Sequence, residues 1–226
     1  MKHVIRAQYR AIIRNGVTES EISLVTEECY RKLKTKVEKG ILLTGTMNRY
    51  KNMLFLYVEY VVNAKGKENT KVEAMPDAWL ENSFRILESW PGVSKKRYWV
   101  YMYPVFWFDQ PKSIEQWRRK EKPTERCGRI AIVYSEKLLS YIYHHQAIVK
   151  EGLLVGDRYQ MISQHENILF SYFECPRDRE RVNISRLDLE SEEIKKWEGA
   201  EPESHFIHLP ESNGENFLII QTVFSL

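Results

Sequence analysis

Residues 138 to 152, LLSYIYHHQAIVKEG, combine two adjacent histidines with two tyrosines on an apolar background. Their spacing predicts an amphipathic helix that ends at Gly152. On such a helix Tyr141 and His145 share one face, while His144 lies on a flanking line. An imidazole titrates near neutrality and can move protons, and a nearby phenol can orient it or bind a substrate hydroxyl. We therefore take Tyr141 and His145 as candidate site residues and discount His144; the alternative is that these histidines only pack in the core or face solvent.

The sequence gives only weak indications of metal binding, thiol chemistry or nucleophilic catalysis. His205 and His208 form H-x-x-H, but on a strand positions i and i+3 face opposite sides, so we expect no metal site. The three cysteines form no C-x-x-C pair, which favours reduced thiols. Glycine-rich phosphate loops and nucleophile-elbow motifs are not found in the sequence. We expect no cofactor.

A short segment occurs twice, and it predicts how these residues are positioned. NMLFLYVE (52–59) and NILFSYFE (167–174) agree at five of eight positions. Each copy follows a predicted strand and a predicted helix that ends in glycine, over 21–40 and 135–152. Each is followed by a second predicted helix with a tryptophan, over 76–90 and 189–197, and by an apolar strand. Each half therefore predicts the order β-α-β-β-α-β of the ferredoxin-like unit.

The fold class predicted from this order is α+β, with two tandem ferredoxin-like repeats forming a dimeric α+β barrel-like core. The first repeat spans 1–110, a charged connector spans 111–127, and the second repeat, with the candidate site, spans 128–226. The two repeats supply internally what a homodimer supplies with two chains. The expected assembly is therefore a monomer with an internal pseudo-dimer, or a homodimer.

Composition places limits on the function. The chain has 226 residues, 43% of them hydrophobic, and a formal net charge of +3 from 34 basic and 31 acidic residues. This predicts a globular protein with a substantial core and no nucleic-acid partner. The N-terminus lacks the pattern of a signal peptide, and no apolar run is long enough to span a bilayer. We expect a soluble cytoplasmic protein with no membrane partner.

The second half resembles the L-rhamnose mutarotase family. The matching features are Tyr-x-x-x-His at Tyr141 and His145, a tyrosine at Tyr159 on the second strand, the third-strand segment NILFSYFE, and Trp197 on the second helix. The resemblance covers roughly 128–226 and, more faintly, 3–110. In the first half Cys29 and Leu33 stand where the tyrosine and histidine would be, so we expect one site per chain.

The resemblance implies an aldose mutarotase-like isomerase, which interconverts sugar anomers without a cofactor. His145 would be the acid/base residue, Tyr141 and Tyr159 would contact the substrate, and Trp197 would stack on the sugar. The expected partner is a small molecule, a monosaccharide. Two alternatives remain open: another enzyme of the same fold, such as a cofactor-free monooxygenase or haem-binding oxidase, and a non-catalytic ligand-binding protein.

Overall fold

The structure is a computed structural model that describes residues 2–63, 76–91, 96–177, 183–184 and 189–226. The chain divides into two compact units. Unit 1 comprises Met1–Met102, Pro111–Glu121 and Gln221–Leu226, and unit 2 comprises Tyr103–Gln110 and Lys122–Ile220.

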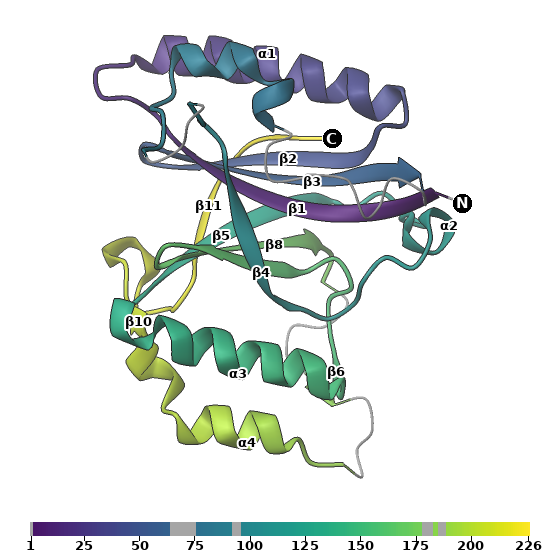
Figure 1. Cartoon of the computed structure of the whole chain (residues 1–226), viewed down its shortest axis with the longest axis vertical. Coiled ribbons are helices and arrows are strands. Elements are labelled where there is room, and N and C mark those ends of the chain that lie inside the picture. Colours follow the sequence, from purple (N-terminus) through teal and green to yellow (C-terminus); the bar gives the residue numbers. More distant parts are fainter. Residues whose placement is uncertain (1, 64–75, 92–95, 178–182, 185–188) are drawn as a thin grey trace. The chain divides into compact units, whose positions relative to one another are not determined.

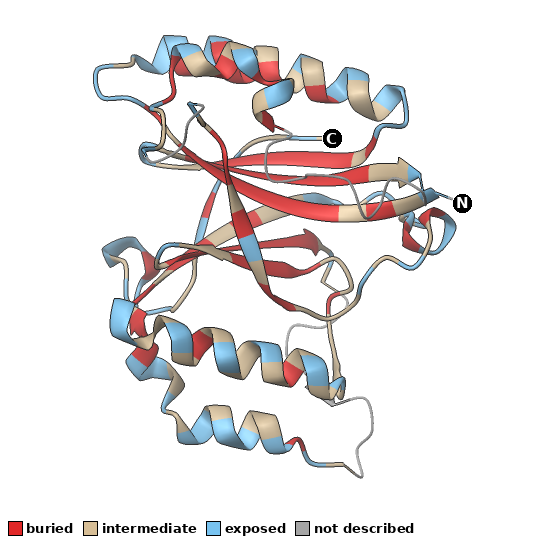
Figure 2. Cartoon of the chain, viewed as in Figure 1, coloured by how far each residue is buried: buried red, intermediate tan, exposed pale blue. Residues whose placement is uncertain are grey.

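Unit 1 is built on antiparallel strands with one long helix over a face of the sheet (Figure 1). Its elements are β1 (Lys2–Ile12), α1 (Glu19–Glu38), β2 (Leu42–Tyr50), β3 (Met53–Asn63), the start of β4 (Val100–Trp107), the short α2 (Ile114–Trp117) and the end of β11 (Leu218–Ser225). β1 pairs with both β3 and β4, and β2 pairs with β3 and with β11. The strands are largely buried (Figure 2).

Helix α1 forms where the sequence predicts it. Thr18 accepts a hydrogen bond from the Glu21 backbone N–H, and the Glu21 carboxylate accepts one from Thr18, which completes a capping box. The helix packs closely on β2, because a Cβ placed at Gly45 would lie 2.5 Å from Leu33 Cδ2. Gly40, just after the helix, has φ +66°, a conformation that glycine adopts without strain.

The helix predicted over 76–90 does not form. The segment folds instead into two 3-10 helices, η3 (Pro76–Ala78) and η4 (Glu81–Arg85). Tertiary hydrogen bonds explain the difference: the Asp77 carboxylate accepts from the backbone N–H groups of Tyr98 and Trp99, and Ser83 Oγ accepts from the Trp99 indole. These bonds hold the segment against the start of β4 and override helix propensity. In the described part of the chain, no helix is long and apolar enough to cross a membrane.

Unit 2 places two helices, α3 and α4, beside its strands (Figure 1). Its elements are the end of β4, β5 (Glu125–Val133), the 3-10 helix η5 (Ser135–Lys137), α3 (Leu138–Glu151), β6 (Leu154–Val155), β7 (Met161–His165), β8 (Ile168–Cys175), β9 (Asn183–Ile184), α4 (Glu192–Gly199), the 3-10 helix η6 (Pro202–His205), β10 (Phe206–Ile207), the 3-10 helix η7 (Pro210–Ser212) and the start of β11. β8 pairs with β5 and β7, β5 also pairs with β10 and β11, β4 pairs with β7, and β6 pairs with β9.

The predicted fold class, tandem ferredoxin-like β-α-β-β-α-β repeats, is wrong. In the described part of the first half, the predicted second helix over 76–90 is replaced by 3-10 turns, and the described part of the second half contains short strands that the repeat does not predict, namely β6, β9 and β10. The longer strands also do not form one sheet per repeat. In both β4 and β11, one end of the strand pairs with a strand of unit 1 and the other end pairs with a strand of unit 2. Each of these strands has a register shift, at Pro104/Phe106 and at Thr222/Phe224. Pro104 has no N–H to donate, which interrupts regular pairing there.

The duplicated strand segment has a structural role in both units. In unit 1 the Tyr57 hydroxyl donates to the Glu59 carboxylate at 2.6 Å, and in unit 2 Tyr172 donates to Glu174 at the same distance. A basic residue completes each group: the Arg6 Nε–H donates to the Tyr57 oxygen, and the Arg126 Nε–H donates to Glu174. The identical tyrosine and glutamate therefore satisfy buried polar groups in each unit.

Candidate functional site

Helix α3 presents the predicted site face to the core of unit 2. Tyr141 and Ile148 are buried, and Leu138, Ile142 and Val149 pack beside them, in the three-to-four spacing of an amphipathic helix. The helix ends at Gly152, whose φ of +74° forms a left-handed cap. The chain therefore turns at the residue that the sequence predicts, and the Tyr141 face points inward.

Tyr141 and His145 are in contact, as their spacing predicts. Their rings stack with centroids 3.8 Å apart and an interplanar angle of 23°. The His145 Nδ1 atom lies 2.9 Å from the Tyr141 carbonyl oxygen. Because a carbonyl only accepts, this contact places the proton of the neutral imidazole on Nδ1 and leaves the Nε2 lone pair available.

Burial controls the protonation of both residues. It lowers the pKa of His145 to about 4, and the nearby imidazoles of His144 and His205 act in the same direction. Burial also raises the pKa of the Tyr141 hydroxyl. At neutral pH the pair is therefore a neutral imidazole stacked on a neutral phenol.

Trp197 on α4 completes this aromatic group. Its ring lies edge-on to Tyr141, with centroids 5.8 Å apart, and to His145 at 4.9 Å. The Glu151 carboxylate, at the end of α3, fixes α4 by accepting from the Ser191 hydroxyl and from the backbone N–H of Glu192 at 3.1 Å. Ser191 in turn caps the helix by accepting from the Ile194 N–H. Glu151 thereby helps to place Trp197 against α3.

Other predicted residues lie elsewhere in unit 2. Tyr159 is not on a strand; it lies in the turn before β7, with the Arg158 guanidinium 5.9 Å from its ring centroid. His205 is buried and its Nε2 lies 3.0 Å from Ser140 Oγ, whereas His208 contacts Asn216. The structure thus brings together Tyr141, His145 and Trp197, and it gives the two histidines of H-x-x-H separate partners.

Arg129 on β5 is a site residue that the sequence analysis missed. It sits directly opposite Ser171 of β8, and its Nε–H donates to Ser171 Oγ at 3.2 Å. Its guanidinium lies over the rings of Phe173 and Phe217, 5.4 and 4.6 Å from their centroids. Among the described residues it has no carboxylate partner within ion-pair distance, and its two terminal nitrogens have no hydrogen-bond acceptor.

Arg129 therefore places a half-buried positive charge beside two aromatic rings, with no carboxylate within ion-pair distance among the described residues. Burial and the nearby charge of Arg177 together lower its pKa to about 10, and the charge of Asp157 acts in the opposite direction. Arg177 itself is paired with Asp157 at 2.5 Å and with Gln160 at 3.1 Å. The positive charge of Arg129 also lowers the pKa of the Tyr141 hydroxyl, although burial outweighs this effect. The sequence feature that could have indicated this residue is the position of an arginine inside the apolar strand GRIAIV.

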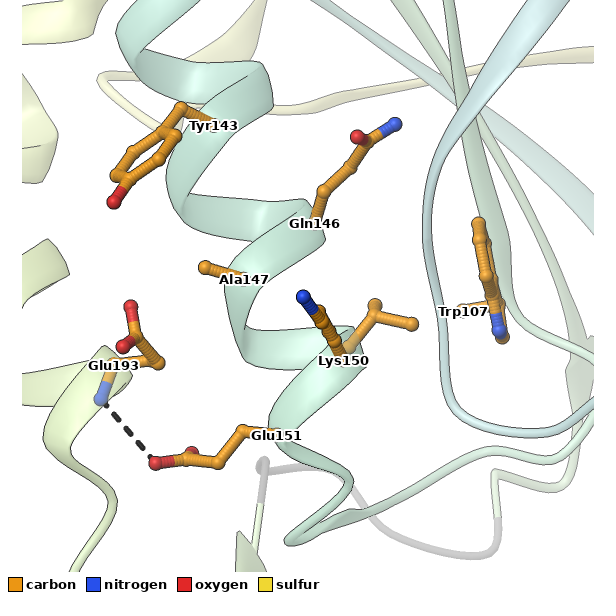
Figure 3. A pocket seen from close by; sticks show the side chains of 8 residues that line it. Trp107, Tyr143, Gln146, Ala147, Lys150, Glu151 and Glu193 are labelled. Atoms are coloured by element: carbon orange, nitrogen blue, oxygen red, sulfur yellow. Dashed lines mark hydrogen bonds between the residues drawn. The ribbon is translucent and has the colours of Figure 1, made fainter.

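A separate groove runs along the other side of α3. It has a volume of about 850 Å³, and its lining residues include Trp107, Tyr143 and Lys150. In Figure 3, Tyr143 and Glu193 lie on one side of the helix, and Gln146 and Trp107 lie on the other. Tyr141, His145, Trp197 and Arg129 do not line it. We therefore place the candidate site on the inner side of α3 and not in this groove.

The isomerase interpretation, a mutarotase-like enzyme of sugar metabolism, is wrong for this arrangement. Mutarotation needs one group that accepts the anomeric proton and another that protonates the ring oxygen. With a pKa of about 4 and its Nδ1 proton engaged by a backbone carbonyl, His145 supplies only an acceptor near neutrality. The unpaired charge of Arg129, the dominant polar feature, suits an anion rather than a neutral sugar.

No family model matches the chain, and no curated protein matches it. Among solved structures, a protein of Fusobacterium nucleatum described as "Putative monooxygenase" is 12% identical, with a TM-score of 0.39, and the match covers 99% of this chain and 94% of that one. A protein described as "anthrone oxidase-like" is 10% identical, with a TM-score of 0.40, covering 99% and 92%. At these values the similarity assigns neither fold nor activity to this chain.

Proposed function

We propose that unit 2 binds a small planar anion between its sheet and helix α3, and that the chain is a cofactor-independent monooxygenase acting on a molecule that ionises to an enolate or phenolate. The observation that carries this proposal is the half-buried guanidinium of Arg129, which lacks a carboxylate partner within ion-pair distance among the described residues. A buried charge is costly unless something compensates it. A bound oxyanion would supply that compensation, and the terminal N–H groups suit bidentate hydrogen bonding.

The surroundings support a flat, aromatic ligand. Phe173 and Phe217 face the guanidinium, and Phe217 lies 6.1 Å from Phe206, which packs edge-on against Tyr141. Aromatic faces and edges pack well against a conjugated ring system. A carbohydrate would instead require several hydrogen-bonding groups in this part of the unit.

His145 is suited to act as the base. Its neutral imidazole offers the Nε2 lone pair, and the backbone of Tyr141 holds the tautomer. A base with a pKa near 4 removes only an acidic proton, such as that of a methylene activated by a carbonyl and an aryl group. Arg129 would stabilise the enolate oxygen that develops as the proton leaves.

The overall reaction balances with molecular oxygen as the oxidant. The substrate CH₂ group loses a proton to His145, the enolate gives electrons to O₂, and a carbon–oxygen bond forms. The resulting hydroperoxide regains the proton and loses water to leave a carbonyl, so that CH₂ and O₂ become C=O and H₂O. The substrate supplies all the electrons, and this chain's residues bind, deprotonate and stabilise charge.

Two probes test the proposal: anthracene carboxylate, which binds without reacting, and anthrone, which has an activated methylene. We expect Arg129→Met to weaken anthracene carboxylate binding by about tenfold or more, measured by its fluorescence, and to abolish anthrone-dependent oxygen uptake. Arg126→Lys, on the opposite face of the same strand, is the matched control and should retain both. The free energy of unfolding of Arg129→Met should equal that of the wild type or exceed it by about 1 kcal/mol, because the substitution removes a half-buried charge that has no carboxylate partner among the described residues.

The outcomes separate binding from catalysis. Equal probe affinity in wild type and Arg129→Met would overturn the anion site. Arg129-dependent binding without oxygen uptake would overturn the monooxygenase activity and leave a ligand-binding protein. That is the second candidate function, and the weak basicity of His145 favours it.

A further inference from the structure

A second cluster of chemically active side chains lies at the start of β5 and the end of β8. Glu125 pairs directly with Cys175 across these strands, and Cys127 pairs with Phe173, the residue two before Cys175. Directly opposed residues and residues two apart share one face of a sheet, so Glu125, Cys127 and Cys175 project to the same side. Their ligand atoms, one from each residue, all lie within 4.8 Å of one another.

The cluster is accessible from solvent. Glu125 is exposed, and both cysteines are half-buried and free of disulfides. In the described part of the chain, the one hydrogen-bond partner of the Glu125 carboxylate is the Cys127 thiol, with Sγ 3.7 Å from Oε2. The intervening Arg126 points to the other face, where Glu174 accepts its Nε–H. Among the described residues, no basic side chain is paired with the Glu125 carboxylate, which is therefore available to a cation from solution.

We infer that Glu125, Cys127 and Cys175 form a binding site for a soft or borderline divalent cation of the zinc class. Zinc binds thiolate sulfur at about 2.3 Å and carboxylate oxygen at about 2.0–2.2 Å, which places ligand atoms of a tetrahedral site about 3.5–4 Å apart. The spacing in the cluster needs only side-chain rotation to reach these values. Two sulfurs select zinc or cadmium over magnesium and calcium. Three protein ligands leave a fourth position for water.

Strand register favours a bridging cation over a disulfide. Cys127 and Cys175 are diagonal neighbours, and such pairs have Cα atoms about 7–8 Å apart, beyond the usual range of about 4.4–6.8 Å for a disulfide. A cation between the sulfurs spans the longer distance without moving the backbone. The sequence does not indicate this site, because the two cysteines are far apart in the chain and only β5–β8 pairing brings them together.

The test uses the full chain in reducing buffer with cadmium, whose thiolate complexes have a charge-transfer band in the ultraviolet. We expect a band that saturates at one cadmium per chain. Zinc should displace the cadmium and remove the band, whereas excess magnesium should not. Cys127→Ser and Cys175→Ser should each lose the band, and Glu125→Gln should bind cadmium more weakly. Cys29→Ser, which alters the buried cysteine of unit 1, is the matched control and should keep the full band.

Alkylation of the unmodified chain provides a second measurement that does not depend on variant folding. Zinc should slow iodoacetamide modification of Cys127 and Cys175, read by mass spectrometry of peptides. No cadmium band, a band that survives both serine variants, or a Cys127–Cys175 disulfide in the protein as purified would overturn the proposal. Because this cluster does not include Arg129 or His145, loss of the cation site leaves the proposed function to its own test.

Discussion

At the scale of single residues, unit 2 holds two basic side chains whose charged forms burial disfavours. Burial lowers the pKa of Arg129 to about 10 and that of His145 to about 4. The guanidinium stays protonated at neutral pH, whereas the imidazole is neutral. A permanent cation and a neutral base in the same unit can act on one ligand without exchanging a proton between them.

The His145 shift predicts a pH dependence of stability. The ordinary pKa of a histidine is 6.5, and that of His145 in the folded chain is about 4. Between these two pH values, the unfolded chain binds a proton at this residue and the folded chain does not. The free energy of unfolding should therefore fall as the pH is lowered through this window, by about 2 kcal/mol for a half-buried group. Urea titrations from pH 7 to pH 4 should show a smaller decrease for His145→Gln than for the wild type.

The control for this experiment is His208→Gln, whose side chain is exposed and contacts Asn216. Its stability should follow the wild-type pH profile. If His145→Gln also follows the wild-type profile, the imidazole is not excluded from protonation in the folded state, and its proposed role as a neutral base fails.

Sequence reasoning at this scale succeeds where chemistry follows from local spacing. Tyr141 and His145 are one helical turn apart, so their contact depends only on the helix, which the apolar pattern predicts. Arg129 could not be found in the same way. Arg129 stands out because no described residue supplies it with a carboxylate within ion-pair distance, and no local sequence pattern reports such a property of the folded chain.

At the scale of elements, the site depends on how α4 is held against α3. Glu151, the last residue of α3, accepts hydrogen bonds from the first residues of α4, where the helix dipole also favours a negative charge. Trp197 lies further along α4, toward its C-terminus. The position of that indole against His145 therefore depends on a carboxylate in another helix.

Glu151→Ala should loosen α4 while α3 remains folded. The expected loss of unfolding free energy is about 1–2 kcal/mol, since both the capping bonds and the charge at the helix N-terminus are removed. Iodide quenching of tryptophan fluorescence should increase because Trp197 becomes more exposed. Glu192→Ala, which removes an exposed first-turn carboxylate that forms a surface ion pair with Lys195, should change either measurement little. Unchanged quenching in Glu151→Ala would show that other contacts hold α4.

Most of the longer elements follow from local pattern, and the missing helix over 76–90 has a tertiary cause. Thr18 and Glu21 mark the start of α1, and Gly152 marks the end of α3. Over 76–90 the pattern predicts a helix, but Asp77 and Ser83 accept hydrogen bonds from Tyr98 and Trp99, just before β4, and the segment forms short 3-10 turns. Those partners lie about twenty residues away, outside the window in which propensity operates.

At the scale of the whole molecule, strand pairing was the property least accessible from sequence. The apolar runs correctly indicate strands, but they do not indicate which strands pair. β4 pairs with β1 through its first residues and with β7 through its last ones, and β11 pairs with β5 and then with β2. The copies of the strand motif suggested two self-contained halves, although the residues they share form a Tyr–Glu hydrogen bond rather than a domain boundary.

These shared strands predict that neither half of the chain folds alone. A fragment of residues 1–110 lacks the end of β11, which pairs with β2, and also lacks Trp117 and Arg119, which donate to the buried Glu59 carboxylate. A fragment of 128–226 lacks the end of β4 that pairs with β7, together with the start of β5. Each would expose an unpaired strand edge and leave buried polar groups without partners, which favours aggregation. Fragments 1–110 and 111–226 should therefore show little native circular dichroism alone and regain it when mixed. A cooperative unfolding transition in isolated 1–110 would contradict this prediction, and would mean that the pairings within β1, β2 and β3 and the packing of α1 are sufficient for a stable core.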